Sequence, residues 1–332
     1  MENLLHLAPS YTSLPDAFVI PPDRLTLATS AAVSLPVIDL SGSRDEVCRA
    51  IVDAGKEFGF FQVVNHGVSD LAIRDMESLC EEFFRLPAAD KAHLYSEDSR
   101  RPNRLFSGSS YDTGGVKYWR DCLHLTCAFP VGDSTEGWPG KPPRFREVVE
   151  KFAAATRGAG MELLRLLCHG MGLRPGYFEC DISGGDLVLR VNHYPPCPDP
   201  SAALGLPPHH DRNLITLLLP GMVVPGLQVA YNGHWVDVEP VPNAFVVNFG
   251  KQLEVVTNGA LKSVEHRAAT NPARARTSVA TFIRPTADCL VGPAEKFVGE
   301  GSPPCYPALT FSDYMHIHNV ARLEPSLTQK DI

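Results

Sequence analysis

The chain of 332 residues lacks an excess of positive charge, because 30 Lys and Arg residues stand against 38 Asp and Glu residues and give a formal net charge of −8. A protein that binds DNA or RNA needs a basic face. The charge balance therefore argues against a nucleic-acid partner. It leaves small anionic ligands open, since the local field of a pocket can oppose the net charge of the chain.

The sequence also lacks a disulfide framework. Its nine cysteines are an odd number, are scattered along the chain and form no Cys-x-x-Cys pair. This usage is typical of free thiols in a reducing compartment. The chain has no basic segment followed by a long apolar core at its start, and no apolar stretch of membrane-spanning length. We therefore expect a cytoplasmic protein with no membrane partner.

What the sequence does have is enough apolar material for a core, since 44% of its residues are hydrophobic and 20% are charged. Apolar residues recur at helical spacing in several segments. These segments are 45–58, a helix capped by Ser69 or Asp70 and ended by Pro87, 145–172, and 309–320, which we expect to cover the open end of the core. Gly158 and Gly160 weaken the middle of the third helix and are candidates for a break.

From Asp186 onward the pattern changes to short strands separated by Gly and Pro. The expected strands are 60–65, 187–192, 213–219, 226–231, 234–238, 244–249 and 277–283. The pair Asn232-Gly233 is typical of a type I′ turn in a hairpin. Eight or so such strands predict a mainly β fold with flanking helices, built around a double-stranded β-helix, or jelly roll. We expect a helical and mixed N-terminal region (1–170), the jelly-roll domain (171–310), and a C-terminal helix and tail (311–332).

Three residues in the second half of the chain form a candidate metal site. His209, Asp211 and His266 are the two histidines and one carboxylate of a facial triad, which holds non-haem Fe(II) and leaves coordination positions open. On a strand His209 and Asp211 would project to the same face, while His210 would point to the other. Taken singly, each of these histidines has an ordinary core or surface histidine as its alternative.

Arg276 and Ser278 strengthen the metal hypothesis. They share a face of the expected strand 277–283, and a guanidinium offers a planar fork to a carboxylate. They would receive the far carboxylate of a dicarboxylic acid, so the set predicts an oxygenase that consumes 2-oxoglutarate. A zinc hydrolase could use two histidines, one Asp and a water, but it would have no need of Arg276 and Ser278. A catalytically silent binding module is the other alternative, and metal content together with 2-oxoglutarate consumption would separate the three.

Motifs along nearly the whole chain resemble those of the plant 2-oxoglutarate- and Fe(II)-dependent dioxygenases. The matching stretches are Leu35–Leu40, Gly59–Val68, Asn192–Cys197, Pro208–Asp211, Gly226–Val229, Pro242–Asn248 and Arg276–Ser278. The resemblance implies Fe(II), 2-oxoglutarate as cosubstrate, O2, and ascorbate as reductant. It also implies that Tyr194 gives 2-oxoglutarate a phenolic hydrogen bond. Asn192 could orient the groups around the iron, and its alternative role is a structural amide at a strand end.

Two positions depart from the pattern of the family. The residue between the first two metal ligands is usually small and polar, but here it is His210. Many relatives carry an acidic residue where this chain has Lys251. Neither change removes a ligand, and both could alter the surroundings of the metal or the mouth of the pocket.

The substrate is expected to be a small plant metabolite that is hydroxylated or desaturated by a monomeric enzyme. Stretches 1–3, 103–108 and 111–115 are similar to the branch of the family that makes phytosiderophores in grasses, which are small compounds with several carboxylates. The resemblance implies that residues 96–121, which show no clear period, line the substrate pocket. The candidate cations for such carboxylates are Arg104, Lys117, Arg120 and Lys251. Surface or structural ion pairs are the alternative for each of these four cations. Tyr111, Trp119 and Phe282 could instead form a flat aromatic pocket for a flavonoid, alkaloid or phenolic.

Overall fold

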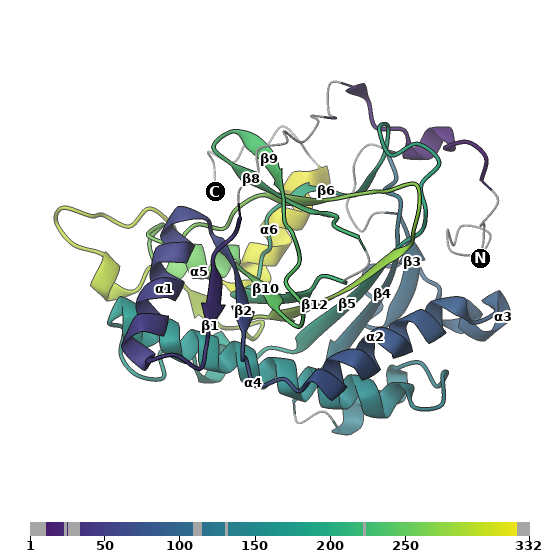
Figure 1. Cartoon of the computed structure of the whole chain (residues 1–332). Coiled ribbons are helices and arrows are strands. Elements are labelled where there is room, and N and C mark those ends of the chain that lie inside the picture. Colours follow the sequence, from purple (N-terminus) through teal and green to yellow (C-terminus); the bar gives the residue numbers. More distant parts are fainter. Residues whose placement is uncertain are drawn as a thin grey trace.

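The computed structural model describes residues 11–22, 25, 34–108, 115–129, 132–221 and 224–323. Within these ranges two β-sheets lie face to face (Figure 1). The larger has eight strands in the order β1-β2-β10-β7-β12-β5-β4-β3, and the smaller has four in the order β6-β11-β8-β9. Their bounds are Val37–Asp39 (β1), Phe60–Val64 (β2), Arg104–Ser107 (β3), Asp121–Cys127 (β4), Leu187–Tyr194 (β5), Leu204–His209 (β6), Ile215–Leu219 (β7), Leu227–Tyr231 (β8), His234–Asp237 (β9), Phe245–Phe249 (β10), His266–Ala269 (β11) and Arg276–Ile283 (β12).

The two facing sheets confirm the jelly-roll fold class. Almost every pair in the larger sheet is antiparallel, and β1 alone among its described strands runs parallel to its neighbour β2. Because β2 pairs with β10, strands from the N-terminal region complete the sheet that carries the C-terminal motifs. The division at residues 170 and 310 stays a prediction.

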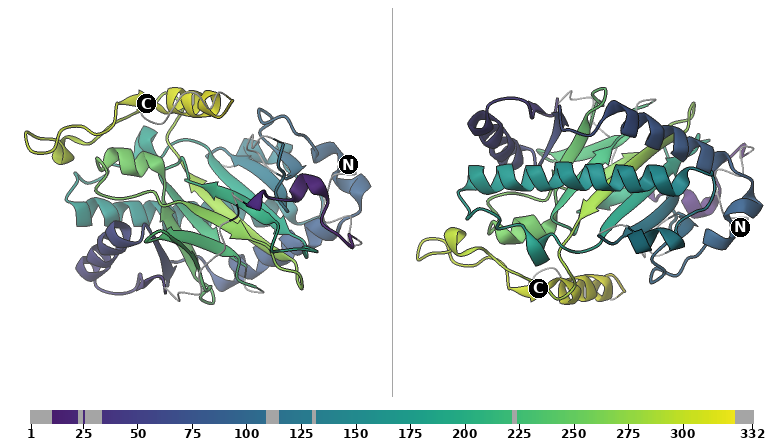
Figure 2. Two further views of the ribbon diagram at one scale, coloured as in Figure 1. Left: turned by 90° about the horizontal axis from the view of Figure 1, so that it is seen from above. Right: turned by 90° about the horizontal axis from the view of Figure 1, so that it is seen from below.

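Helices cover the outer face of the larger sheet, as the view from below in Figure 2 shows for the long helix α4. The helices of the described part are Arg44–Glu57 (α1), Asp70–Arg85 (α2), Ala88–Lys91 (α3), Phe145–Met171 (α4), Lys251–Val256 (α5) and Phe311–Leu323 (α6). The main hydrophobic core lies between the sheet and α1, α2 and α4. This explains why a strand such as β10 is buried on both faces.

A much smaller apolar cluster lies between the two sheets. It consists of Leu35, Phe60, Leu227, Val229, Val236, Val238 and Val246, all from one end of the sandwich. The pocket between the sheets is lined by polar and charged side chains as well as apolar ones. Because the main core lies on the outer face of the larger sheet, the space between the two sheets is available for a functional site.

The helix α4 corrects one expectation. It runs unbroken through Gly158 and Gly160. A Cβ built on Gly160 would lie 2.3 Å from Cδ1 of Ile283 on β12, so the glycine allows the helix to pack closely on the sheet. Gly160 is thus a packing residue rather than a break. The other expected helices are confirmed, and Ser69 caps α2 through a 3.2 Å hydrogen bond that its Oγ accepts from the Ala72 backbone N–H.

The expected hairpin is confirmed as well. Asn232 and Gly233 join β8 to β9 with φ of 49° and 79°. A type I′ turn needs positive φ at both central residues.

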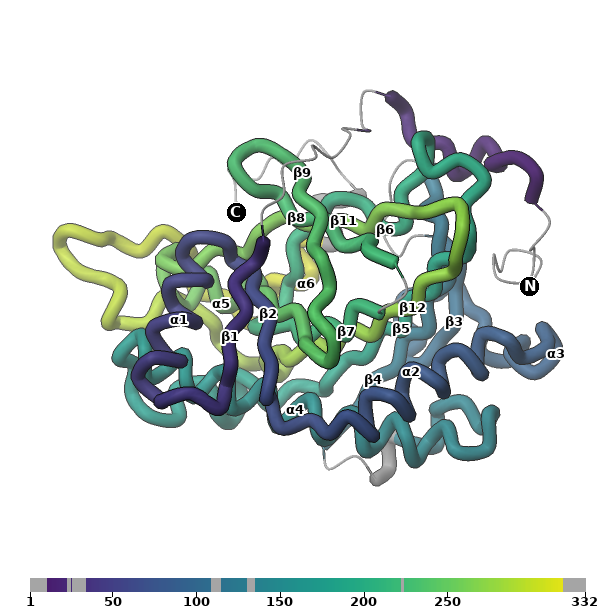
Figure 3. The backbone as a smooth tube through the Cα atoms, in the orientation of Figure 1, coloured from purple at the N-terminus to yellow at the C-terminus, as the bar shows by residue number. Residues whose placement is uncertain are grey.

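Five of these twelve strands were not expected, namely β1, β3, β4, β6 and β11. The segment 96–121, which shows no clear period in the sequence, contains all of β3 and the first residue of β4. Their inward residues include Arg104 and His124, and in β4 the polar His124 alternates with Leu123 and Leu125 of the main core. The strands β6 and β11 are short, and they lie side by side above β7 and β12 in Figure 3. None of the described helices is both long enough and apolar enough to cross a membrane.

Candidate metal and carboxylate site

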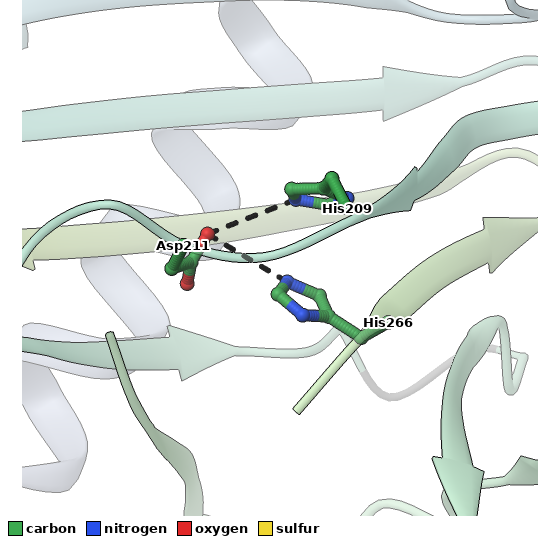
Figure 4. Close-up of side chains that lie close together, drawn as sticks. All are labelled: His209, Asp211 and His266. Atoms are coloured by element: carbon green, nitrogen blue, oxygen red, sulfur yellow. Dashed lines mark ion pairs between the residues drawn. The ribbon is translucent and has the colours of Figure 1, made fainter. Parts of the chain in front are cut away.

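The structure brings His209, Asp211 and His266 together between the sheets (Figure 4). Nε2 of each histidine lies 3.7 Å from Oδ1 of Asp211, and the ligand atoms of all three residues lie within 4.8 Å of one another. The two histidines face each other because His266 pairs with His209 across β11 and β6. Their ring centroids are 4.2 Å apart. This is a compact set of two nitrogen donors and one oxygen donor.

Each of these side chains is oriented by a second contact on the side away from the cluster. Nδ1 of His209 lies 2.9 Å from the Pro207 carbonyl oxygen, and Nδ1 of His266 lies 3.2 Å from that of Val264. When each Nδ1 carries the proton, it donates to the carbonyl and the lone pair of Nε2 faces the centre.

The carboxylate of Asp211 is fixed in the same way. Its Oδ2 accepts hydrogen bonds from Oγ1 of Thr216 at 2.6 Å and from Nδ2 of Asn248 at 2.8 Å. Both donors lie on the larger sheet, so that sheet orients a ligand that follows a strand of the smaller one. Oδ1 is left to face the histidines.

The electrostatics of the cluster favour metal-binding protonation states. Burial, and next the neighbouring His266, hold the pKa of His209 well below its usual value. Burial raises the pKa of Asp211, but His266, His209 and the two hydrogen bonds outweigh it and leave that pKa below its usual value. A neutral imidazole beside an ionised carboxylate is the form that binds a cation. The donor set therefore fits Fe(II) in a facial triad with open positions.

One detail differs from the expectation that a strand presents both His209 and Asp211. Strand β6 ends at His209, and Asp211 lies beyond it. The carboxylate reaches the cluster through its bonds to Thr216 and Asn248 rather than through the strand period. His210 does point away, and its Nδ1 lies 2.9 Å from the Ser263 carbonyl oxygen.

A narrow interior pocket extends from the triad along the larger sheet. Arg276, Ser278, Tyr194 and Asn192 all line it, together with the three residues of the triad. Arg276 pairs with Tyr194, and Ser278 pairs with Asn192, across β12 and β5. The period of the two strands thus places all four side chains on the inner face. The structure brings together every residue that the sequence suggested for Fe(II) and 2-oxoglutarate.

Arg276 lies deep in this pocket. It is 4% exposed, and its guanidinium lies 5.2 Å from the centre of the Tyr194 ring. Burial lowers the pKa of Arg276 and the Tyr194 hydroxyl opposes the shift. Because the ordinary value is so high, the guanidinium stays charged at neutral pH. A buried fork beside the Ser278 and Tyr194 hydroxyls fits one carboxylate of 2-oxoglutarate.

The residues suggested for the substrate divide into two groups. Arg120 and Phe282 line the interior pocket. Lys251 lines a different cavity, where its Nζ lies 3.1 Å from Oε2 of Glu254. Arg104 and Lys117 line neither of these two cavities. Tyr111 lies outside the described residues.

Trp119 lines neither of the two cavities, so its assignment to the substrate pocket stays a prediction without support from the geometry. It is 1% exposed, its Nε1 donates to the Pro195 carbonyl at 3.1 Å, and its ring packs edge-on against Phe18 at 5.1 Å. The ring faces the N-terminal segment rather than the interior pocket.

Sequence reasoning missed Arg190, which also lines the interior pocket. Its Nε lies 3.4 Å from Nδ1 of His124, and its guanidinium lies 5.5 Å from the centre of the Phe282 ring. The signal was available, because the strand period that selects Asn192 and Tyr194 also places Arg190 on the same face.

Comparison with known proteins agrees with this geometry. Residues 185–285 match the model of the 2OG-Fe(II) oxygenase superfamily, and residues 35–146 match the non-haem dioxygenase N-terminal region that is described from morphine synthesis. A 2'-deoxymugineic-acid 2'-dioxygenase of Hordeum vulgare is 64% identical over 327 residues, which cover 98% of this chain and 96% of that protein.

The chain belongs to the 2OG-Fe(II) oxygenase superfamily.

Two further members extend the comparison. A mugineic-acid 3-dioxygenase of Hordeum vulgare is 56% identical over 99% of this chain and 97% of its own length. The crystal structure of JOX2 in complex with 2OG, Fe and JA superimposes with a TM-score of 0.86 at 34% identity, covering 95% of this chain and 92% of that one. The protein is therefore an Fe(II)- and 2-oxoglutarate-dependent dioxygenase that uses O2, as the sequence predicted.

Proposed function

We propose that this dioxygenase hydroxylates 2'-deoxymugineic acid at the 2' position to give mugineic acid, a step of phytosiderophore synthesis. The observation that carries the proposal is the 64% identity to a 2'-deoxymugineic-acid 2'-dioxygenase over nearly the whole chain. The charges of the interior pocket support it independently.

In this proposal, His209, Asp211 and His266 hold Fe(II), and Arg276, Ser278 and Tyr194 hold the carboxylate of 2-oxoglutarate that lies far from the metal. With Fe(II) bound, O2 and 2-oxoglutarate supply the oxidising chemistry, which releases succinate and CO2 and transfers one oxygen atom to the substrate. Ascorbate would keep the metal reduced. The protein contributes mainly position, which can amount to about 7–11 kcal/mol of a reaction barrier in favourable cases.

A row of basic side chains crosses the inner face of the larger sheet. Arg104 pairs with His124, and His124 pairs with Arg190, across β3, β4 and β5. Burial, and next the charges of Arg190, Arg104 and Arg284, lower the pKa of His124 to about 2. The histidine is thus a neutral group among three guanidinium groups. Such a concentration of positive charge suits a substrate with several carboxylates, and Arg104 belongs to it although it does not line the pocket itself.

Two alternatives use the same iron chemistry. The 56% identity to a mugineic-acid 3-dioxygenase favours mugineic acid, the proposed product, as a second candidate substrate. Hydroxylation or desaturation of a flavonoid, alkaloid or other secondary metabolite is the other alternative. Three aromatic residues were suggested for such a pocket, namely Tyr111, Trp119 and Phe282. Of these, Phe282 is the one that lines the interior pocket in the described part of the chain.

One turnover experiment separates these substrates. Fe(II)-loaded protein, purified without oxygen, would be mixed with 2-oxoglutarate, ascorbate, air and one of three compounds: 2'-deoxymugineic acid, mugineic acid or a flavanone. Succinate and the mass of the product are followed together. We expect one succinate for each 2'-deoxymugineic acid that gains one oxygen atom. Slow succinate formation with unmodified 2'-deoxymugineic acid would contradict the proposal and direct the search to the other two compounds.

We also propose that the enzyme acts as a cytoplasmic monomer without nucleic-acid or membrane partners. The net charge of −8 and the scattered cysteines support this assignment. Light scattering of the purified protein should give a mass near 36.2 kDa, and a mass twice as large would contradict the monomer. Imaging of the tagged protein in plant cells would test the compartment.

A further inference from the structure

Arg120 is a buried cation with an unused donor. It is 1% exposed, and its Nη2 is fully buried without a hydrogen-bond partner in the described part of the chain. Its other two nitrogens are engaged, since Nε donates to the Gly108 carbonyl at 3.3 Å and Nη1 donates to Oδ1 of Asn192 at 2.6 Å. Among the described residues no carboxylate forms an ion pair with it.

The strand period directs Arg120 into the interior pocket. It precedes β4 by one residue, and Asp121, the first residue of β4, pairs with His193 on β5. The side chain of His193 points to the outer face, where it stacks on Phe84 at 4.5 Å. Arg120 therefore shares the inner face with Asn192, and both line the pocket that contains the triad.

An unpaired buried guanidinium nitrogen is costly, because the group loses its hydration and gains no hydrogen bond in return. Arg276 lines the same pocket, and a carboxylate bound to Arg276 neutralises one positive charge there. That carboxylate does not give Nη2 of Arg120 a hydrogen-bond acceptor. The hydrogen bond from Nη1 of Arg120 to Oδ1 of Asn192 holds the guanidinium in one orientation, and Nη2 is the donor that stays available.

We propose that Arg120, oriented by Asn192, is a second carboxylate-binding residue of the interior pocket, in addition to Arg276. The inference rests on the proposed function, which supplies two sources of a second carboxylate. One is the carboxylate of 2-oxoglutarate that lies next to its keto group, and the other is a carboxylate of the substrate. The chemistry of recognition is the same for both, a guanidinium N–H that donates to a carboxylate oxygen.

The test is calorimetric binding to Fe(II)-loaded protein without oxygen. 2-Oxoglutarate is titrated first, and 2'-deoxymugineic acid is then titrated with saturating 2-oxoglutarate present. The variants are Arg120→Met, which removes the charge, and Arg120→Lys, which keeps the charge without the fork. The matched control is Arg157→Met, because Arg157 also has a buried guanidinium nitrogen without a partner but lies on α4, outside the pocket.

We expect Arg120→Met to weaken the binding of one of the two compounds at least tenfold, Arg120→Lys to weaken it less, and Arg157→Met to change neither more than about twofold. Weaker 2-oxoglutarate binding assigns Arg120 to the cosubstrate. Weaker 2'-deoxymugineic acid binding, with 2-oxoglutarate unchanged, assigns it to the substrate.

Unchanged binding of both compounds to a folded Arg120→Met variant would overturn the proposal. Failure of both Arg120 variants to fold, judged by near-UV circular dichroism, would also overturn it in favour of a structural role. If the wild-type protein does not bind 2'-deoxymugineic acid, the proposed substrate is wrong, and the 2-oxoglutarate titration alone decides the role of Arg120.

Discussion

Two cavities meet at His209, and they differ in size and in charge compensation. The interior pocket has a volume of about 50 Å3, and the outer cavity, which lies between α5, α6 and the segment around His210, has about 560 Å3. In the outer cavity Lys251 pairs with Glu254, which also accepts a 2.7 Å hydrogen bond from the Tyr306 hydroxyl. The large cavity therefore already contains opposite charges in contact.

The interior pocket contains guanidinium groups that face few acids. Arg120, Arg190, Arg267 and Arg276 line it, and Asp211 is the one acidic residue among its described lining residues. The comparison teaches that cavity size does not identify the ligand site. Uncompensated buried charge does, because a fold that holds it without a ligand bears the cost of desolvation.

Among variants that test the difference between the two cavities, those of the metal triad should have the largest effect on turnover. Asp211→Ala or His266→Ala should abolish iron-dependent turnover and leave a folded protein, because each removes one of three metal ligands. Iron content and succinate formation are the measurements. His210→Ala is the matched control, since His210 points into the outer cavity and should leave the iron content unchanged. Wild-type succinate production by either triad variant would end the ligand assignment.

Arg276→Lys should weaken 2-oxoglutarate binding by about 10- to 100-fold, because a point charge does not replace the planar fork of a guanidinium. The apparent affinity for 2-oxoglutarate measures the effect. Lys251→Met in the outer cavity should change that affinity less than about twofold. Equal affinities in the Arg276→Lys variant and the wild-type protein would contradict the distinction between the cavities.

Asn248→Ala should lower iron affinity by about tenfold, because it removes one of the two hydrogen bonds that hold Oδ2 of Asp211, and contacts of this kind typically change metal affinity 10- to 100-fold. Competition with a chelator measures the change. An affinity equal to that of the wild-type protein would show that Thr216 alone orients the carboxylate.

The smallest effect concerns His124, whose pKa burial and the surrounding arginines lower to about 2. An unfolded histidine titrates near 6.5, so below that pH the unfolded chain binds a proton that the folded chain does not. Stability is therefore lost as the pH falls. Between pH 6.5 and 5.5 the wild-type protein should lose about 1 kcal/mol more than His124→Gln in urea unfolding. Parallel losses would show that burial and the arginines do not lower the pKa of His124 in the folded protein.

Much of the fold could be predicted because its signals are local. The helices have apolar residues at regular spacing, and Asn232-Gly233 specifies its own turn. The strand β4 was not predicted, although it alternates apolar Leu123 and Leu125 with polar His124 and Thr126, which is the pattern of a half-buried strand. The strand β3 has four residues, Arg104–Ser107, and shows no such alternation.

The residues of the candidate site likewise divide into those that the sequence indicates and those that only the fold brings to the pocket. His209, Asp211, His266 and Arg276 were suggested by their types and spacing, and the geometry brings them together. Which of the other cations reach the pocket depends on pairing between distant segments. Arg120 meets Asn192 across 72 positions of the sequence, whereas Lys117 and Lys251, equally basic in sequence, do not reach the pocket. The roles of all these residues stay predictions until the variants are measured.

The most direct test of the central claim is turnover of 2'-deoxymugineic acid under 18O2, with mass analysis of both products. The account predicts that the hydroxylated product carries one 18O atom and that one labelled succinate forms with it. A hydroxylated product without 18O, or 2'-deoxymugineic acid that remains unmodified while 2-oxoglutarate is consumed, would contradict it.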